Sequence, residues 1–180
     1  MKNLYLVVLL LVMTASRFAV ADDGTAPCPN HLPVSIMNVL SKSYLGWNVA
    51  SMKMLNQQDQ KRFRPYVNVN CYGLISGNFT SEGTSYAIYL LKKKGDNYVN
   101  ELVVFQDTKV KVNQYVLIPS SNAASAVILR KVPRRTRVKD AETGRHFLAQ
   151  RDIVDLLDPD KGEVQFIWKD GKFITLISSE

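Results

Sequence analysis

The chain has 180 residues, which is the length of one domain and is enough to bury a hydrophobic core without additional cross-links. Its formal net charge of +7 concerns solubility and the approach of partners, and does not specify a fold. After the N-terminal apolar run, no segment is apolar over the roughly 20 residues that a membrane-spanning helix requires, which excludes a protein with several membrane-spanning helices.

The N-terminal residues have the features of an export signal. Lys2 precedes an apolar run from Leu4 to Met13, and small residues lead to Ala19-Val20-Ala21, the A-x-A pattern that a signal peptidase cleaves. The alternative is a membrane anchor, but the run is shorter than a roughly 20-residue membrane span. We therefore expect residues 1–21 to be a signal peptide and residues 22–180 to form a single periplasmic domain that is not inserted in the membrane. Cleavage removes two cations, Lys2 and Arg17, and lowers the formal charge from +7 to +5.

Both cysteines, Cys28 and Cys71, follow the expected cleavage site. An oxidising compartment favours a disulfide between them. The bridge would close a loop of about 40 residues and stabilise the fold by roughly 3–4 kcal/mol if its geometry is unstrained. Two free thiols are the alternative, and neither arrangement makes a cysteine a nucleophile.

The first element after the leader is an expected amphipathic helix over residues 32–45. Pro33 lies near its first turn, Gly46 follows its last turn, and apolar residues recur at three- and four-residue spacing: Ile36, Met37, Leu40, Tyr44 and Leu45. Core packing is the simplest role for this apolar stripe. Residues 48–70 are ambiguous between a short strand and a turn of helix, and Pro65 ends any helix there.

From Tyr72 onward the apolar pattern changes to period two, with many β-branched and aromatic residues. This pattern predicts strands at about 73–79, 85–92, 98–106, 113–118, 126–132, 152–157, 163–169 and 172–178. Residues 94–97 and 169–172 are predicted hairpin turns, the second with Asp-Gly as a type I′ pair. The predicted fold class is α+β: an antiparallel meander of about seven or eight strands with the N-terminal helix packed on it.

The segment from Pro133 to Gln150 is polar and irregular, and we expect it to be a long exposed loop. It carries the candidate partner-binding residues Arg134, Arg135, Arg137, Lys139 and His146. Nucleic acid is a poor partner for an exported protein, and aromatic residues for base stacking are not interleaved with these cations. An acidic protein surface or an anionic envelope polymer fits better. The alternative is a solvated strand edge whose charges discourage sheet association.

The loop over residues 77–86 places oxygen-bearing side chains at alternate positions, as calcium loops do. The positions carry Asn78, Thr80 and Glu82, followed by Gly83. Since Glu82 is the only carboxylate among them, calcium binding should be weak or lost. We expect no metal and no cofactor. Asn78-Phe79-Thr80 is also an N-glycosylation sequon, which we expect to be silent in a bacterial periplasm.

The same region carries a family resemblance. The matching residues are Leu74, Gly77, Asn78, Phe79, Gly83, Tyr86, Ala87, Leu90 and Leu91. They resemble a degenerate form of the G-D-F-D-G-D-G-x-x-D-Y-A-x-L-L signature of FG-GAP or VCBS-type repeats, in which the aspartates are replaced and the loop is about one residue shorter. Residues 166–173 are similar to the W-x-G-x-F hairpin that closes many periplasmic proteins of this kind. Some of these proteins resemble lysozyme inhibitors or are immunity proteins against secreted cell-wall-degrading toxins.

The resemblance implies a binding protein: an immunity protein or inhibitor of a peptidoglycan-targeting hydrolase, such as a type VI secretion effector. Loops 133–150, 107–113 and 93–97 are the candidates for insertion into the hydrolase, and a homodimer is left open. A carbohydrate- or polymer-binding envelope protein that uses Trp47 and Trp168 is the alternative. We expect no enzyme, because neither histidine has a partner at metal-ligand spacing and no nucleophile motif is present. The remaining catalytic candidates are the acidic residues between Asp152 and Glu163, and their simplest interpretation is that they form a turn.

Overall fold

The computed structural model describes residues 32–66, 71–108, 110–122, 127–139, 144–159 and 161–178. These residues form mostly antiparallel β-structure with two α-helices and one 3-10 turn. No helix among them is long and apolar enough to cross a membrane. The expected signal peptide and Cys28 lie outside the described residues, so the cleavage site and the Cys28–Cys71 pairing remain predictions. Cys71 is half-buried and is not a free thiol.

The first sheet contains the strands β1 to β5. Their bounds are Asn48–Val49 for β1, Leu74–Gly77 for β2, Ser85–Lys94 for β3, Asn97–Asp107 for β4 and Val112–Asn122 for β5. The strand order is β1-β3-β4-β5, and β2 also pairs with β3. The long strands β3 and β4 are joined by the predicted tight turn, in which Lys94 pairs with Asn97 and Gly95 takes the positive φ that the turn needs.

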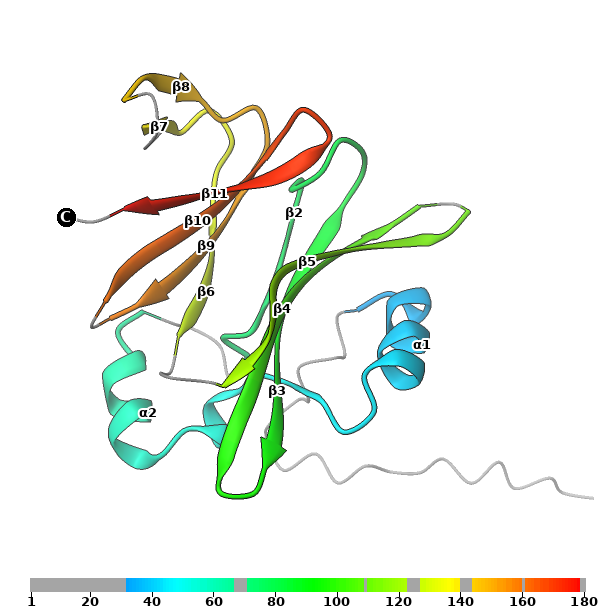
Figure 1. Ribbon diagram of the computed structural model, residues 1–180, viewed down its shortest axis with the longest axis vertical. Coiled ribbons are helices and arrows are strands. Elements are labelled where there is room, and N and C mark those ends of the chain that lie inside the picture. Colours follow the sequence, from blue (N-terminus) through cyan, green and yellow to red (C-terminus); the bar gives the residue numbers. More distant parts are fainter. Residues whose placement is uncertain are drawn as a thin grey trace, which may run out of the picture.

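The second sheet is formed by four strands from the C-terminal part of the chain. They are β6 (Ile128–Val132), β9 (Ile153–Asp158), β10 (Gly162–Lys169) and β11 (Lys172–Ser178), in the order β11-β10-β9-β6. A separate two-stranded hairpin of β7 (Arg137–Lys139) and β8 (His146–Leu148) lies at one end of this sheet, at the upper left of Figure 1.

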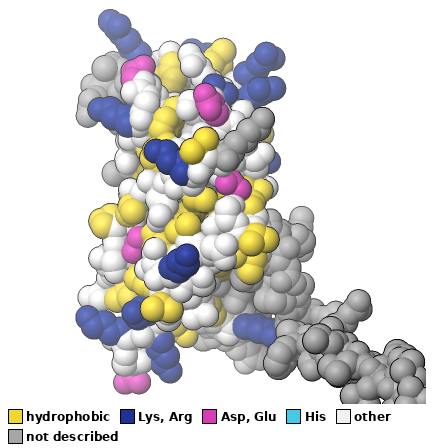
Figure 2. Space-filling view, turned by 90° about the vertical axis from the view of Figure 1, so that its right-hand side faces the viewer, with side chains coloured by type: hydrophobic (Ala, Val, Ile, Leu, Met, Phe, Trp, Pro, Cys, Tyr) yellow, Lys and Arg dark blue, Asp and Glu magenta, His cyan; other side chains and the backbone are white. Residues whose placement is uncertain are grey.

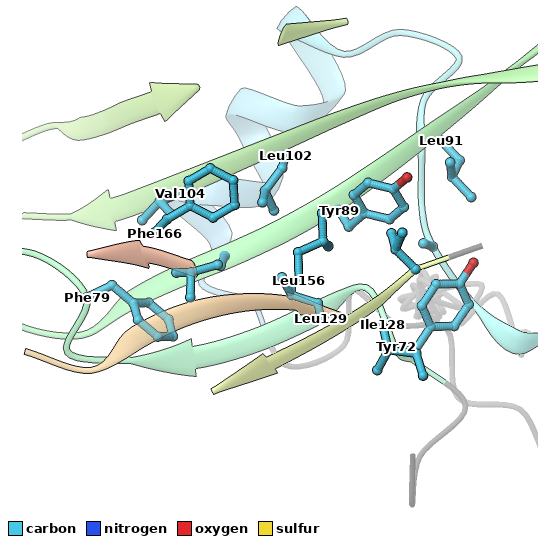
Figure 3. Packing of buried hydrophobic residues seen from close by; sticks show 14 of the residues in the cluster. Tyr72, Phe79, Tyr89, Leu91, Leu102, Val104, Ile128, Leu129, Leu156 and Phe166 are labelled. Atoms are coloured by element: carbon cyan, nitrogen blue, oxygen red, sulfur yellow. The ribbon is translucent and has the colours of Figure 1, made fainter. Parts of the chain in front are cut away.

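The core lies between the two sheets because alternate residues of the long strands face it. Tyr89 and Leu102 of the first sheet meet Leu156 and Phe166 of the second, as Figure 3 shows. The intervening residues of β3 and β4 point to the opposite face of the first sheet and are also buried. Because both faces of β3 are buried, residues 87–91 form a continuous apolar run in the sequence.

Helix α1 (Val34–Ser43) lies on that opposite face, at the right in Figure 1 and toward the viewer in Figure 2. Ile36 is fully buried there against Ile88, Leu90 and Phe105. The ambiguous segment before β2 contains the 3-10 turn Met52–Met54 and the short helix α2 (Gln57–Phe63). The side chain of Phe63 packs in the core between the two sheets. Asn56 caps α2 by accepting a hydrogen bond from the backbone N–H of Asp59 at 2.9 Å.

A close backbone junction fixes the start of the first sheet. Ala50 N–H donates to the Tyr89 carbonyl at 2.9 Å, Gly73 N–H donates to the Ala50 carbonyl at 3.1 Å, and Tyr89 N–H donates to the Gly73 carbonyl at 2.8 Å. A Cβ atom at position 73 would lie 2.6 Å from the Ala50 Cβ, so only glycine fits without displacing the neighbouring chain.

The structure differs from the predicted single meander in two ways. The strands separate into two sheets, because β6 pairs with β9 and not with its sequence neighbour β5. The segment Pro133–Gln150, predicted to be a long exposed loop, contains the β7–β8 hairpin. Its strands have three residues each, which is too short for a period-two pattern to be recognised.

Candidate functional site

The β7–β8 hairpin holds three of the candidate partner-binding residues in fixed register. Arg137 pairs with Leu148, Val138 with Phe147 and Lys139 with His146. Because side chains alternate across a strand, the middle pair faces one way and the two outer pairs face the other.

The inner side of the hairpin is anchored to the second sheet. Val138 is buried and Phe147 is half-buried, and both pack with Ile153 and Ile167. The hairpin is therefore held by apolar contacts as well as by its own ladder, although two three-residue strands alone would be marginal in water.

The outer side of the hairpin is exposed. We call this surface the hairpin face; it consists of Arg137, Lys139, His146 and Leu148. Leu148 is 61% exposed and makes the face partly apolar. An apolar side chain among cations on a well-anchored element is a typical arrangement for contacting another protein, in which the apolar group is the anchor and the charges guide approach.

Arg134 and Arg135 lie in the turn that enters the hairpin, and both are exposed. Arg135 N–H donates to the Ala149 carbonyl at 2.7 Å, and Ala149 N–H donates to the Thr136 carbonyl at 3.0 Å. Arg135 has φ = 69°, a left-handed conformation that is unfavourable for a residue with a side chain. The structure thus brings all five candidate residues to one end of the molecule.

Asp152 connects the base of the hairpin to the loop between β2 and β3. Its Oδ1 accepts from Arg134 N–H at 3.0 Å and its Oδ2 accepts from Asn78 N–H at 2.9 Å, while its own N–H donates to the Asn78 carbonyl at 3.0 Å. A Cβ at Gly77 would lie 2.9 Å from Asp152 Oδ2, so the glycine allows the carboxylate to approach. Asp152 therefore has a clear structural role.

The loop that resembles a calcium site is built from internal hydrogen bonds. Thr80 is fully buried, and its hydroxyl lies 2.9 Å from that of Ser85. Gln106 Nε2 donates to the Glu82 carbonyl at 2.9 Å, and Gly83 takes φ = 65°. Within the described ranges, no three His, Cys, Asp or Glu residues are placed to hold a metal ion.

The remaining acidic residues of this cluster that the structure describes are paired with basic side chains. Asp155 is fully buried, accepts from Arg130 Nε at 2.7 Å, and shares that guanidinium with Glu163. Burial raises the pKa of Asp155, and its hydrogen bond with Arg130 opposes this change. Asp158 lies 3.8 Å from Lys161 in the next turn, and Asp160 lies outside the described residues.

A pocket of about 580 Å³ lies beside the hairpin, between β8, the chain that leads to β9, and the turn from β10 to β11. Among the described residues, its lining is Ser81, Arg145, His146, Phe147, Leu148, Gln150, Arg151, Ile167, Trp168, Lys169 and Asp170. The Lys169 ammonium group lies 5.4 Å from the centre of the Phe147 ring. The pocket thus joins the hairpin face at His146 and Leu148.

Sequence reasoning identified His146 but missed Leu148, Arg145, Arg151 and Lys169. Leu148 is one of several apolar residues in its segment, and only the hairpin register shows that it faces outward. For Lys169 the sequence indicates only a hairpin turn, because the proximity of β10 to β8 depends on the packing of the second sheet.

The other predicted sites lie elsewhere. The turn over residues 93–97 is at the opposite end of the molecule, and the turn between β4 and β5 lies to the right of the sheets in Figure 1. Trp47 packs edge-on against Tyr44, and Trp168 packs edge-on against Tyr115 and Phe173. The two tryptophans therefore belong to separate aromatic clusters and do not form one stacking platform.

Comparison with known proteins adds no assignment: no protein-family model, no curated protein and no solved structure matches this chain. The resemblance to FG-GAP or VCBS-type proteins thus rests on residues 74–91 and 166–173 of the sequence alone.

Proposed function

We propose that this chain is an exported binding protein that neutralises a peptidoglycan-targeting hydrolase toxin in the periplasm, as an immunity protein or inhibitor. The observation that carries the proposal is the hairpin face, where exposed Leu148 lies among Arg137, Lys139 and His146 on an element anchored from behind. The export signal and the family resemblance of the sequence supply the compartment and the class of partner.

Charge supports an acidic partner. The cations in or near the hairpin end on described residues include Arg134, Arg135, Arg137, Lys139, Arg145, Arg151 and Lys169. The exposed acidic side chain among the lining residues of the adjoining pocket is Asp170. A surface with this excess of positive charge accelerates association with an acidic protein and slows association with a basic one.

The anchoring of the hairpin supports tight binding. Val138 and Phe147 are packed on the sheet, and the hydrogen bonds of Asp152 and Ala149 hold the base of the hairpin. Ordering a flexible loop on binding costs free energy, and an element that is already ordered avoids this cost.

The first experiment is a pull-down with residues 22–180 as bait against lysate and secreted proteins of the source organism, followed by mass spectrometry. Recovery of one hydrolase in stoichiometric amount, with activity that falls when this protein is added, supports the proposal. Recovery of cell-wall fragments without any hydrolase contradicts it and favours the polymer-binding alternative.

A charge-reversal pair then tests the location of the binding surface. Replacing Arg134, Arg135 and Arg137 by Glu should lower the association rate constant by roughly tenfold or more, since close charges steer encounter. The matched control replaces Lys92, Lys93 and Lys94, which are exposed at the opposite end, by Glu. Equal effects of the two triple changes would show that total charge matters and the hairpin does not.

An apolar pair tests the anchor. Leu148→Asp should raise the dissociation rate constant, because a buried apolar anchor contributes mainly to the lifetime of a complex. Leu45→Asp is the control, since Leu45 is 72% exposed and lies beyond α1. An unchanged dissociation rate for Leu148→Asp removes the hairpin face from the interface.

A further inference from the structure

The pocket beside the hairpin combines cationic and apolar residues in one concave lining. Three cationic residues line it: Arg145, Arg151 and Lys169. Asp170 is the acidic residue among its described lining. Arg151 and Lys169 outnumber Asp170 among these residues, which favours an anionic group in the pocket.

The apolar part of the lining determines what else the ligand carries. Phe147, Ile167 and Trp168 contribute to the wall, and Ile167 is buried. Carbon atoms of a ligand would lose contact with water against these residues, and ion pairs formed beside them would be less screened by solvent. A small inorganic anion would leave these apolar contacts unused.

Lys169 is positioned for this role by Phe147. Its ammonium group lies 5.4 Å from the ring centre, within the range of a cation–π interaction. This contact restrains the long side chain beside the pocket, so less conformational entropy is lost when an anion binds. Arginine adds planar pairs of N–H donors that match the two oxygens of a carboxylate.

The volume sets the size of the ligand. About 580 Å³ lies in the range of roughly 300–1,000 Å³ that small-molecule sites occupy. The pocket therefore accommodates one or two amino-acid residues.

We infer that the pocket binds a carboxylate flanked by apolar atoms, and that the ligand is an acidic side chain of the partner protein with its neighbouring residue. The inference rests on the proposed function, since the pocket adjoins the hairpin face at His146 and Leu148. Arg151 and Lys169 of this pocket bind the carboxylate, and the pocket is thus the part of the surface that recognises the partner.

The test uses two capped dipeptides and the chain over residues 22–180. N-acetyl-Leu-Glu-amide and its neutral analogue N-acetyl-Leu-Gln-amide are titrated while backbone amide chemical shifts are recorded by NMR. We expect saturable shifts at Phe147, Ile167 and Lys169 with the acidic peptide, and affinity at least roughly tenfold lower for the neutral peptide, as loss of a charge-assisted hydrogen bond predicts.

Substitutions locate the binding group. Lys169→Gln and Arg151→Gln should each weaken binding of the acidic peptide several-fold, and Asp170→Asn should strengthen it. Lys94→Gln and Asp96→Asn are the matched controls, because both residues are exposed in the β3–β4 turn. Equal affinity for the two peptides, or the same shifts with sulfate, would overturn the inference, as would affinity that is unaffected by Lys169→Gln.

The double variant Arg151→Gln, Lys169→Gln separates this inference from the proposed function. A hydrolase that the unaltered protein captures should be lost or bound at least tenfold more weakly by the variant. If the hydrolase binds both proteins equally, the pocket is not the recognition site and the inhibitor function stands. If the acidic peptide binds as expected but no hydrolase is captured, the carboxylate site stands and the inhibitor function is refuted.

Discussion

Replacement of Asp152 by Ala tests whether one carboxylate holds the hairpin end together. The side chain accepts two backbone N–H groups, from Asn78 at 2.9 Å and from Arg134 at 3.0 Å, and it is only partly exposed. A hydrogen bond to a charged group contributes about 1.5–3 kcal/mol, so Asp152→Ala should lower the free energy of unfolding by about 3 kcal/mol. The domain should still fold, because such domains have stabilities of roughly 5–15 kcal/mol.

The assay is urea unfolding followed by tryptophan fluorescence, with Asp152→Asn as the graded control. The amide keeps one acceptor oxygen and loses the charge, so its destabilisation should fall between zero and that of Asp152→Ala. Amide hydrogen exchange should also speed up at Val138 and Phe147, since the base of the hairpin is no longer held. A change below about 0.5 kcal/mol for Asp152→Ala would refute the reasoning, because surface substitutions without a structural role fall in that range.

Three further results are expected. Gly73→Ala should lower the free energy of unfolding by about 3 kcal/mol or more in thermal or urea unfolding, because the new Cβ would lie 2.6 Å from the Ala50 Cβ. A decrease below about 1 kcal/mol would contradict the close approach of the two chains at Gly73 and Ala50. Arg135→Gly should stabilise the fold by up to about 1 kcal/mol by relieving φ = 69°, yet should slow association with the partner; a destabilised variant would argue against the strained turn. Burial, followed by the charge of Glu101, raises the pKa of Tyr44 to about 12. The pKa of Tyr44 in the folded state lies above its value in the unfolded state, so its contribution to the free energy of unfolding should be fully present below about pH 10 and be lost as the pH rises toward 12. The free energy of unfolding should therefore fall less steeply with pH in Tyr44→Phe. Equal slopes in the two proteins would show that Tyr44 does not cause the pH dependence.

Local features of the fold were predictable because they depend on neighbouring residues. The Asp170-Gly171 pair predicts a type I′ turn, and both residues have the positive φ that this turn requires, 51° and 81°. The strand predicted at residues 172–178 coincides with β11, and α2 ends before Pro65 as expected.

The partition into two sheets was not predictable in the same way. A period-two pattern identifies a strand but not its neighbour, which depends on residues far along the chain. Strand β6 pairs with β9 in a register that places Arg130 opposite Asp155 and Leu129 opposite Leu156. Nothing near residue 130 indicates either partner.

The candidate site was partly predictable. The density of arginine and lysine pointed to residues 134–139, because charge is visible in sequence. The exposure of Leu148 and the convergence of Arg151 and Lys169 on one pocket were not visible, since they follow from the hairpin register and from the packing of β8 near β10.

Each of the two sheets is formed from its own continuous stretch of chain, with the first sheet complete at Asn122 and the second beginning at Ile128. Their facing sides share one apolar core, so neither stretch can bury its hydrophobic side by itself. We therefore expect a break in the backbone between these two residues to leave two fragments that fold only when they meet. Such a pair could be fused to other proteins as a two-part reporter, in which recovery of the folded domain signals that the fused proteins have come together.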